Sequence, residues 1–180
     1  MGVAGDGLSA VTRAQPEVTM NFDFTPQQKS ARAEFRAFVG TEIVPHADRF
    51  DREQRIPAEL IEQLGARGYL GLTLPQEWGG GAADMLTYGL LNEEVGRGCS
   101  SVRSLLTVHG MVAHAILRWG TRAQKERWLP KIAAGENLGA FALTEPEAGS
   151  DSQSIETTAH SYGNAYVLNG RKKRSEEHTV

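Results

Sequence analysis

The hydrophobic periodicity of the chain changes once, near Gly135, and this change constrains the fold more than any other feature. From residue 21 to residue 135 the apolar residues recur every three or four positions, which is the period of amphipathic helices. After residue 135 the apolar runs are short, rich in Thr, Tyr, Ile and Val, and separated by turn residues. The pattern predicts an α+β fold, in which an N-terminal all-α helical domain is followed by the truncated start of a β domain.

Capping signals divide the helical part into five helices. Thr25 and Thr121 each stand three residues before a Gln, which is the capping-box spacing at the start of a helix. Asp84 is a suitable N-cap for another helix, and Pro45 is expected to end or kink the first one. Gly120 is expected to form a left-handed C-cap after the most apolar helix. The apolar faces predict core positions at Ala31, Phe35, Phe38, Val39, Ile43, Leu60, Ile61, Leu64, Met85, Leu90, Leu91, Val95, Trp119, Trp128, Leu129 and Ile132.

Three short segments in the last quarter of the chain have strand-like sequences, namely residues 138–143, 155–159 and 162–168. Residues 161–164 contain Gly163 and can turn the chain between the last two segments. Three strands seldom close a barrel or fill a sandwich. We therefore expect this chain to hold only the beginning of a β domain.

Composition divides the chain into four segments. Residues 1–20 show no sustained period, and we expect them to form a flexible leader. Residues 21–136 are expected to form the helical domain, and residues 137–173 the start of the β domain. Residues 174–180 are polar and match the translated start of a common sequencing adapter, so we interpret them as a non-native tail.

Charge and cysteine content exclude several classes of function. The formal net charge is -3, so the chain lacks the basic excess that nucleic-acid binding requires. Cys99 is the only cysteine, which excludes an internal disulfide and a multi-cysteine metal site. His109 and His114 face different sides of a helix, so we expect no metal site. The apolar runs are too short to span a membrane, and we expect a cytoplasmic protein.

The segment between the first two predicted strands combines features of an anion-binding loop. Consecutive backbone N–H groups near Gly149 and Ser150 can form a concave site for a pyrophosphate, and the hydroxyls of Thr144 and Ser150 can bond to the edge of a heterocycle. A polar hairpin turn explains the same spacing, and the spacing alone favours the turn. Glu145 and Asp151 are expected to hold this turn.

Longer strings in the chain resemble one known family. Residues 141–151 (FALTEPEAGSD) closely resemble the flavin-binding signature of the acyl-CoA dehydrogenase family, although Glu147 replaces the small residue usual there. Residues 74–80, 121–130 and 166–173 are similar to further segments of that family, in the same order. The resemblance extends from about residue 21 to residue 173.

The resemblance implies a flavoprotein oxidoreductase that uses FAD to oxidise the α,β carbon–carbon bond of an acyl thioester, with the acyl group on CoA or on an acyl carrier protein. Phe141, Leu143 and Thr144 would lie along the isoalloxazine, with Thr144 bonding near its reactive nitrogen. Gly149 and Ser150 would approach the pyrophosphate, and Ser150 would also contact the substrate. The candidate cofactor-binding residues are Phe141, Ala142, Leu143, Thr144, Gly149 and Ser150.

The family's catalytic base is a glutamate on a C-terminal helical bundle, so we expect no catalytic residue in these 180 residues and no activity from them alone. The full-length protein is expected to be a homo-oligomer with an electron-transfer partner. Residues 100–112 are similar to members that act on carrier-protein thioesters. The alternative is a non-catalytic, truncated helical interaction module, whose bare helical faces would contact a partner.

Overall fold

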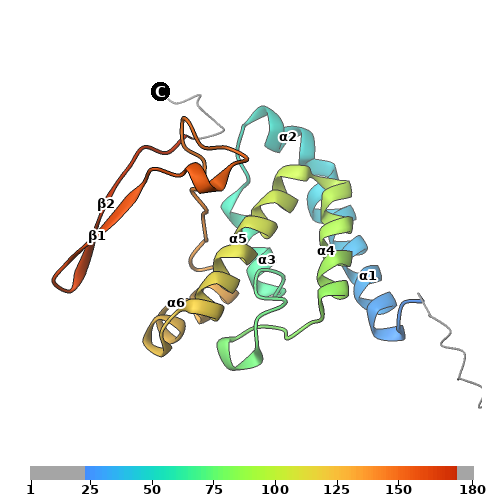
Figure 1. The fold of residues 1–180 in the computed structure, drawn as a ribbon. Coiled ribbons are helices and arrows are strands. Elements are labelled where there is room, and N and C mark those ends of the chain that lie inside the picture. Colours follow the sequence, from blue (N-terminus) through green and yellow to red (C-terminus); the bar gives the residue numbers. More distant parts are fainter. Residues whose placement is uncertain (1–22, 174–180) are drawn as a thin grey trace, which may run out of the picture.

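The computed structural model describes residues 23–173, so the predicted leader and tail lie outside the described residues. Within this range six α-helices form one body, and a β-hairpin extends away from it (Figure 1). The helices are α1 (Pro26–Phe38), α2 (Ala47–Arg52), α3 (Ala58–Ala66), α4 (Met85–Gly98), α5 (Ser100–Trp119) and α6 (Arg122–Ala134). The strands are β1 (Thr158–Tyr162) and β2 (Ala165–Asn169). This arrangement confirms the predicted α+β class with the helical part first.

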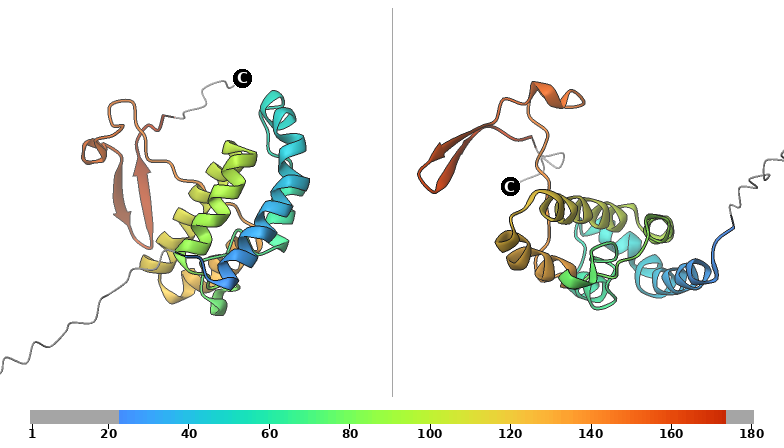
Figure 2. Two further views of the ribbon diagram at one scale, coloured as in Figure 1. Left: turned by 90° about the vertical axis from the view of Figure 1, so that its right-hand side faces the viewer. Right: turned by 60° about the horizontal axis from the view of Figure 1, so that its bottom comes forward.

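The helices pack largely in chain order. α1 packs against α4, α4 against α5, and α5 against α6, while α3 also contacts α6. Figure 2 shows the hairpin standing apart from this body in both views. Short helical turns join the longer elements at Val39–Ile43, Val44–His46, Gln76–Trp78 and Ser152–Ser154. In the part of the chain that the structure describes, no helix combines the length and apolar character needed to cross a membrane.

The predicted N-terminal caps are confirmed. The Thr25 hydroxyl accepts from the Gln28 backbone N–H at 3.2 Å, and the Gln28 side chain accepts from the Thr25 N–H at 3.0 Å. The same reciprocal pair begins α6 at Thr121, and the Asp84 carboxylate accepts from the Thr87 N–H at 2.6 Å. Each cap satisfies N–H groups that the first helical turn leaves without partners. Pro45 lies in the second of two irregular turns, Val39–Ile43 and Val44–His46, which separate α1 from α2, so the regular helix is interrupted there as predicted.

The predicted left-handed cap at Gly120 is wrong. Gly120 has φ −68° and ψ 148°, which is extended backbone. The reason is that only Gly120 and Thr121 separate α5 from α6, so the chain must extend at once to reach the next N-cap. The left-handed cap lies instead at Gly135, where φ is 79° at the end of α6.

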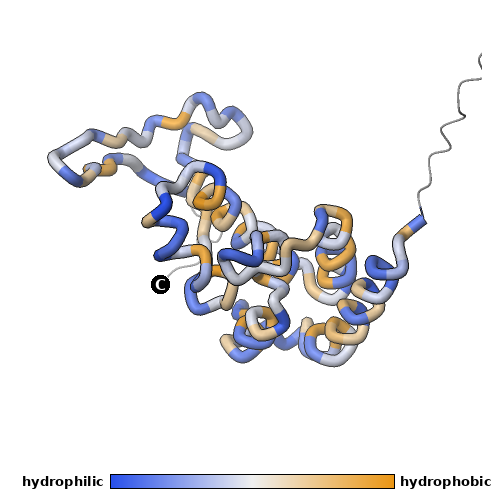
Figure 3. Tube along the Cα trace, turned by 90° about the horizontal axis from the view of Figure 1, so that it is seen from below, coloured by the Kyte–Doolittle hydropathy of each residue, from blue (hydrophilic) through white to orange (hydrophobic). Residues whose placement is uncertain are grey.

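Buried side chains form two neighbouring clusters. The larger joins α1, α3, α4 and α5 and contains Phe35, Phe38, Val39, Ile43, Phe50, Leu60, Leu64, Tyr69, Leu70, Leu90, Leu91, Val95, Val102 and Leu106. The smaller lies around α6 and contains Leu74, Trp78, Ala113, Leu129, Ile132 and Ala133. In Figure 3 the apolar positions recur along the helices, whereas the hairpin has few of them. Most of the predicted core is therefore confirmed.

Three predicted core residues are exposed instead. Met85 is 67 % exposed and Trp119 is 74 % exposed, because they are the first residue of α4 and the last residue of α5. Trp128 is 38 % exposed, and its ring lies 4.9 Å from the Arg127 guanidinium. It directly precedes the buried Leu129, and adjacent residues of a helix point about 100° apart.

The strand predictions are confirmed only in part. β1 and β2 pair antiparallel through a two-residue turn with Gly163 at φ 59°, although both begin three residues later than predicted. The strand predicted at residues 138–143 is wrong: these residues have no ladder partner among residues 23–173. An apolar run becomes a strand only where a second strand accepts its backbone hydrogen bonds.

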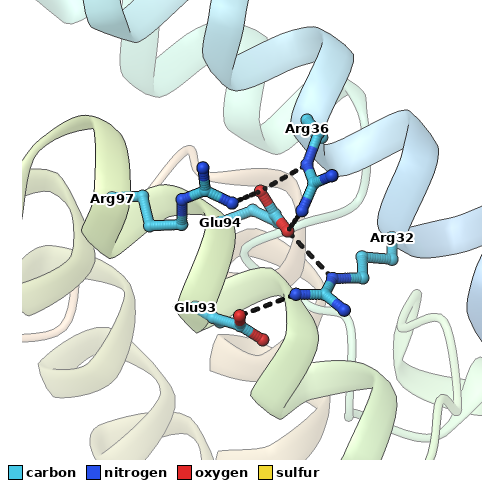
Figure 4. A network of polar contacts seen from close by, with 5 residues as sticks. All are labelled: Arg32, Arg36, Glu93, Glu94 and Arg97. Carbon is cyan, nitrogen blue, oxygen red and sulfur yellow. Dashed lines mark hydrogen bonds and ion pairs between the residues drawn. The ribbon is translucent and has the colours of Figure 1, made fainter.

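A buried carboxylate joins α1 to α4 (Figure 4). Glu94 has a side chain only 3 % exposed, and it bonds to Arg36 at 2.7 Å, Arg32 at 2.9 Å and Arg97 at 3.5 Å. Arg32 also reaches the exposed Glu93 at 2.7 Å. Hydrogen bonds from Arg36 and then Arg32 lower the pKa of Glu94 to about 2, although burial opposes this shift.

We expect Glu94→Gln to lower the free energy of unfolding by about 2 kcal/mol at neutral pH, because three arginines lose their shared anion. Folding lowers the pKa of Glu94 from 4.5 to about 2, so its contribution is complete above pH 4.5 and is lost as the pH falls towards 2. Urea unfolding at several pH values should show the difference from wild type shrinking across that range. The control Glu93→Gln should change stability by less than about 0.5 kcal/mol; equal losses in both variants would contradict the network's role.

Candidate functional site

The loop that follows α6 is built around the buried side chain of Glu145. Its carboxylate, 4 % exposed, accepts from the backbone N–H of Glu156 at 2.7 Å and of Thr157 at 3.1 Å. It also accepts from the Thr157 hydroxyl, and Lys172 forms an ion pair with it at 2.8 Å. A carboxylate with this many donors needs no further partner. Glu145 thus holds residues 145–157 against Lys172, which lies three residues beyond the end of β2.

The electrostatics of the loop confirm that Glu145 and Asp151 hold the turn. Lys172, the Thr157 hydroxyl and the Glu156 N–H lower the pKa of Glu145 to about 2. Bonds from Ser154 at 2.5 Å and from the Gln153 N–H at 3.1 Å lower the pKa of Asp151. Both carboxylates are therefore charged at neutral pH and are poor proton acceptors.

The backbone of residues 143–144 uses its carbonyl groups for anchoring. The Leu143 carbonyl accepts from the Lys172 ammonium at 3.2 Å, and the Thr144 carbonyl accepts from the Lys173 N–H at 2.9 Å. Within residues 23–173, the N–H groups of Leu143 and Thr144 and the Thr144 hydroxyl donate to no protein acceptor. The anchoring thus leaves hydrogen-bond donors available along this stretch.

All six candidate cofactor-binding residues are exposed and lie on this one loop. Phe141 is 52 % exposed and Leu143 is 38 % exposed, which is unusual for large apolar side chains. A Cβ built on Gly149 would meet no atom within 4 Å. In the described part of the chain, the N–H groups of Gly149 and Ser150 have no acceptor. The loop thus carries both exposed apolar side chains and unbonded donors, which suit a ligand with a flat apolar body and an acceptor-rich edge.

Neither of two surface cavities, one on the loop and one on the helical body, is lined by a candidate residue. One of about 310 Å³ is lined by Glu145, Pro146, Glu147, Glu156, Gly170 and Arg171, so its acidic side chains are unsuited to a pyrophosphate. The other, of about 400 Å³, lies between α5 and α6 beside Trp119 and Trp128. Among residues 23–173, no group of three His, Cys, Asp or Glu side chains could hold a metal ion.

Sequence reasoning missed two residues that shape this region. Lys172 has no role assigned from the sequence, yet it anchors both Leu143 and Glu145. His109 was considered only as a metal ligand, yet it bonds to Ile132 and Gly139. No short sequence pattern predicts these four contacts, because the partners in each are 20 or more residues apart in the chain.

Comparison with known proteins places the chain among acyl-CoA dehydrogenases and their relatives. A family model described as "Acyl-CoA dehydrogenase, N-terminal domain" matches residues 25–136. An acryloyl-CoA reductase (NADH) of Anaerotignum propionicum is 40 % identical over 155 residues, covering 85 % of this chain and 39 % of that protein. The probable acyl-CoA dehydrogenase YngJ of Bacillus subtilis is 38 % identical, with 85 % and 40 % covered. The chain thus spans about two fifths of the length of the curated relatives it matches.

Solved structures give the same result. A glutaryl-coenzyme A dehydrogenase in complex with glutaryl-CoA superposes with a TM-score of 0.80 at 36 % identity, covering 84 % of this chain and 39 % of that one. A glutaryl-CoA dehydrogenase from Mycobacterium smegmatis in complex with FADH2 superposes with a TM-score of 0.78 at 34 % identity, covering 82 % and 38 %.

The anchoring role of Glu145 can be tested with a neighbouring control. We expect Glu145→Gln to accelerate amide exchange at Glu156 and Thr157 about tenfold, because one neutral amide oxygen replaces a carboxylate with four donors. Hydrogen exchange measured by NMR provides the readout. Glu147→Gln, an exposed change two residues away, should leave both amides as in wild type. Unchanged protection in Glu145→Gln would show that the loop does not depend on this carboxylate.

Proposed function

This chain belongs to the acyl-CoA dehydrogenase family, and we propose that it is the front part of an FAD-dependent enzyme that oxidises the α,β carbon–carbon bond of an acyl thioester. The observation that carries the proposal is the loop of residues 141–150, which carries exposed donors and exposed apolar side chains and is anchored by the buried carboxylate of Glu145. We further propose that residues 21–136 form one domain, that residues 137–173 begin a second, and that the enzyme works in the cytoplasm.

Each candidate residue has a proposed role that its exposure allows. Phe141 and Leu143 would contact the flavin ring, with Ala142 between them. Thr144 would donate to the ring's acceptor edge, and Gly149 and Ser150 would approach the pyrophosphate, with Ser150 also near the acyl group. The support is that these donors have no protein acceptor within residues 23–173, while the carbonyls of Leu143 and Thr144 are already bonded.

When bound, FAD supplies the redox chemistry and accepts the two electrons that leave the substrate. The residues of this chain would orient the ring and exclude water from one side of it. Glu145 and Asp151 are unsuited to take the α proton, since their pKa values are lowered by their own partners. The family resemblance implies a base on a C-terminal helical bundle, so we propose that the base lies outside these 180 residues and that they do not catalyse alone.

The substrate and partners are proposed at the level of chemical class. A CoA thioester is supported by relatives named for acyl-CoA substrates, and the carrier-protein alternative rests on the resemblance of residues 100–112 alone. A solved neighbour described as an electron-transferring flavoprotein of Acidaminococcus fermentans, 34 % identical with a TM-score of 0.79, supports an electron-transfer partner. We propose a homo-oligomer for the full-length protein. One relative is named a reductase, so activity assays should run in both directions.

A non-catalytic helical interaction module is the second candidate. Met85, Leu86, Met111 and Trp119 are 47–74 % exposed, and such apolar side chains on helices suit contacts with a partner. This candidate predicts no flavin binding at any length of the gene product.

We expect Thr144→Val and Ser150→Ala each to weaken FAD affinity about tenfold, because each removes one hydrogen bond to the cofactor. The test is FAD titration, followed by flavin fluorescence, of the gene product extended to the length of its relatives. Thr158→Val and Ser161→Ala remove matching hydroxyls from the exposed strand β1 and should leave affinity unchanged. An extended product that stays colourless with excess FAD would refute the proposed function and favour the interaction module.

A further inference from the structure

His109 is buried in α5 and bridges two backbone segments that are distant in sequence. The residue is only 1 % exposed. Nε2 lies 3.1 Å from the carbonyl oxygen of Ile132 in α6, and Nδ1 lies 3.2 Å from the backbone nitrogen of Gly139. A carbonyl can only accept and an N–H can only donate. The two contacts therefore require a neutral ring with its proton on Nε2 and a free lone pair on Nδ1.

The backbone at Gly139 passes unusually close to the same helix. A Cβ built on Gly139 would lie 2.7 Å from the Cβ of Val112, a distance that side chains essentially never reach. The Asn137 N–H also bonds to the Lys131 carbonyl at 3.2 Å. Residues 137–139 are thus held against α5 and α6 by two hydrogen bonds and by direct contact.

This docking point lies two residues before Phe141 and five before Thr144. On the far side, the Lys173 N–H bonds to the Thr144 carbonyl at 2.9 Å. Residues 140–144 therefore run between two fixed points, one on the helical body and one at the end of the hairpin. The position of the candidate flavin-binding residues 141–144 relative to the helices therefore depends on the contacts made at Gly139.

We propose that His109 is a positioning residue, which fixes the flavin-facing segment 140–144 to the helical body by bonding to Ile132 and Gly139 at once. This proposal rests on the proposed function for its ligand but not for its geometry. Imidazole suits the task because its donor and acceptor lie on different edges of a rigid ring. Burial lowers the pKa of His109, which maintains the neutral ring that both contacts need.

Two conservative variants separate the two bonds. In His109→Asn the side-chain oxygen can take the place of Nδ1 and accept from Gly139. In His109→Gln the longer amide can take the place of Nε2 and donate to Ile132, while the acceptor for Gly139 is lost. We expect amide exchange at Gly139, measured by NMR on this chain, to be about tenfold faster in His109→Gln and within about twofold of wild type in His109→Asn.

Equal acceleration in both variants, or faster exchange throughout α5, would assign His109 a packing role only and overturn the proposal. The protonation state of the His109 ring in the wild-type protein gives an independent test, which does not depend on whether any variant folds. A long-range ¹H–¹⁵N spectrum should show Nε2 protonated and Nδ1 bare, and a proton on Nδ1 would overturn the proposal.

The flavin arm of the experiment uses the extended gene product. There His109→Gln should weaken FAD affinity about tenfold and His109→Asn about twofold or less. If wild type binds no FAD while the Gly139 exchange pattern holds, the proposed function fails and the bracing by His109 stands. If wild type binds FAD and both variants bind equally well, the positioning role fails alone.

Discussion

The candidate site depends on a carboxylate that finds its partners inside the protein. Burying a charge is costly unless cations and donors surround it, and Glu145 meets this condition through Lys172, Thr157 and the backbone of Glu156. Those partners lie just before β1 and just after β2, so the carboxylate ties the loop to both ends of the hairpin. Glu94 obeys the same rule between α1 and α4. One buried anion thus organises the helical body, and another organises the loop.

The local features of the fold were predictable because their causes lie within a few residues. The caps at Thr25, Asp84 and Thr121 need partners three positions away, and all three form. Helical periodicity located every long helix, and the turn at Gly163 followed from its residue type. The loop of residues 141–151 was identified from a continuous string, which is also a local signal.

What the sequence did not predict depends on contacts between distant residues. Lys172 and Glu145 are 27 residues apart, and His109 and Gly139 are 30 apart, so no short pattern links them. Residues 138–143 have the composition of a strand, but Gly139 donates to an imidazole and no second strand pairs with the segment in the described range. Trp119 is of a residue type typical of a core, yet its position at the end of α5 leaves it exposed. In each case tertiary context overrode a correct local preference.

The direction in which the loop backbone is anchored determines which ligands it can accept. The carbonyls of Leu143 and Thr144 are bonded to Lys172 and Lys173, so this stretch presents donors to its surroundings. A backbone anchored through its N–H groups would present acceptors instead, which suit the acceptor edge of the proposed flavin ring poorly. In the proposed site, unbonded main-chain N–H groups would therefore supply much of the donor set for the cofactor. Glu147, which stands where the family signature has a small residue, is exposed and takes no part in this anchoring.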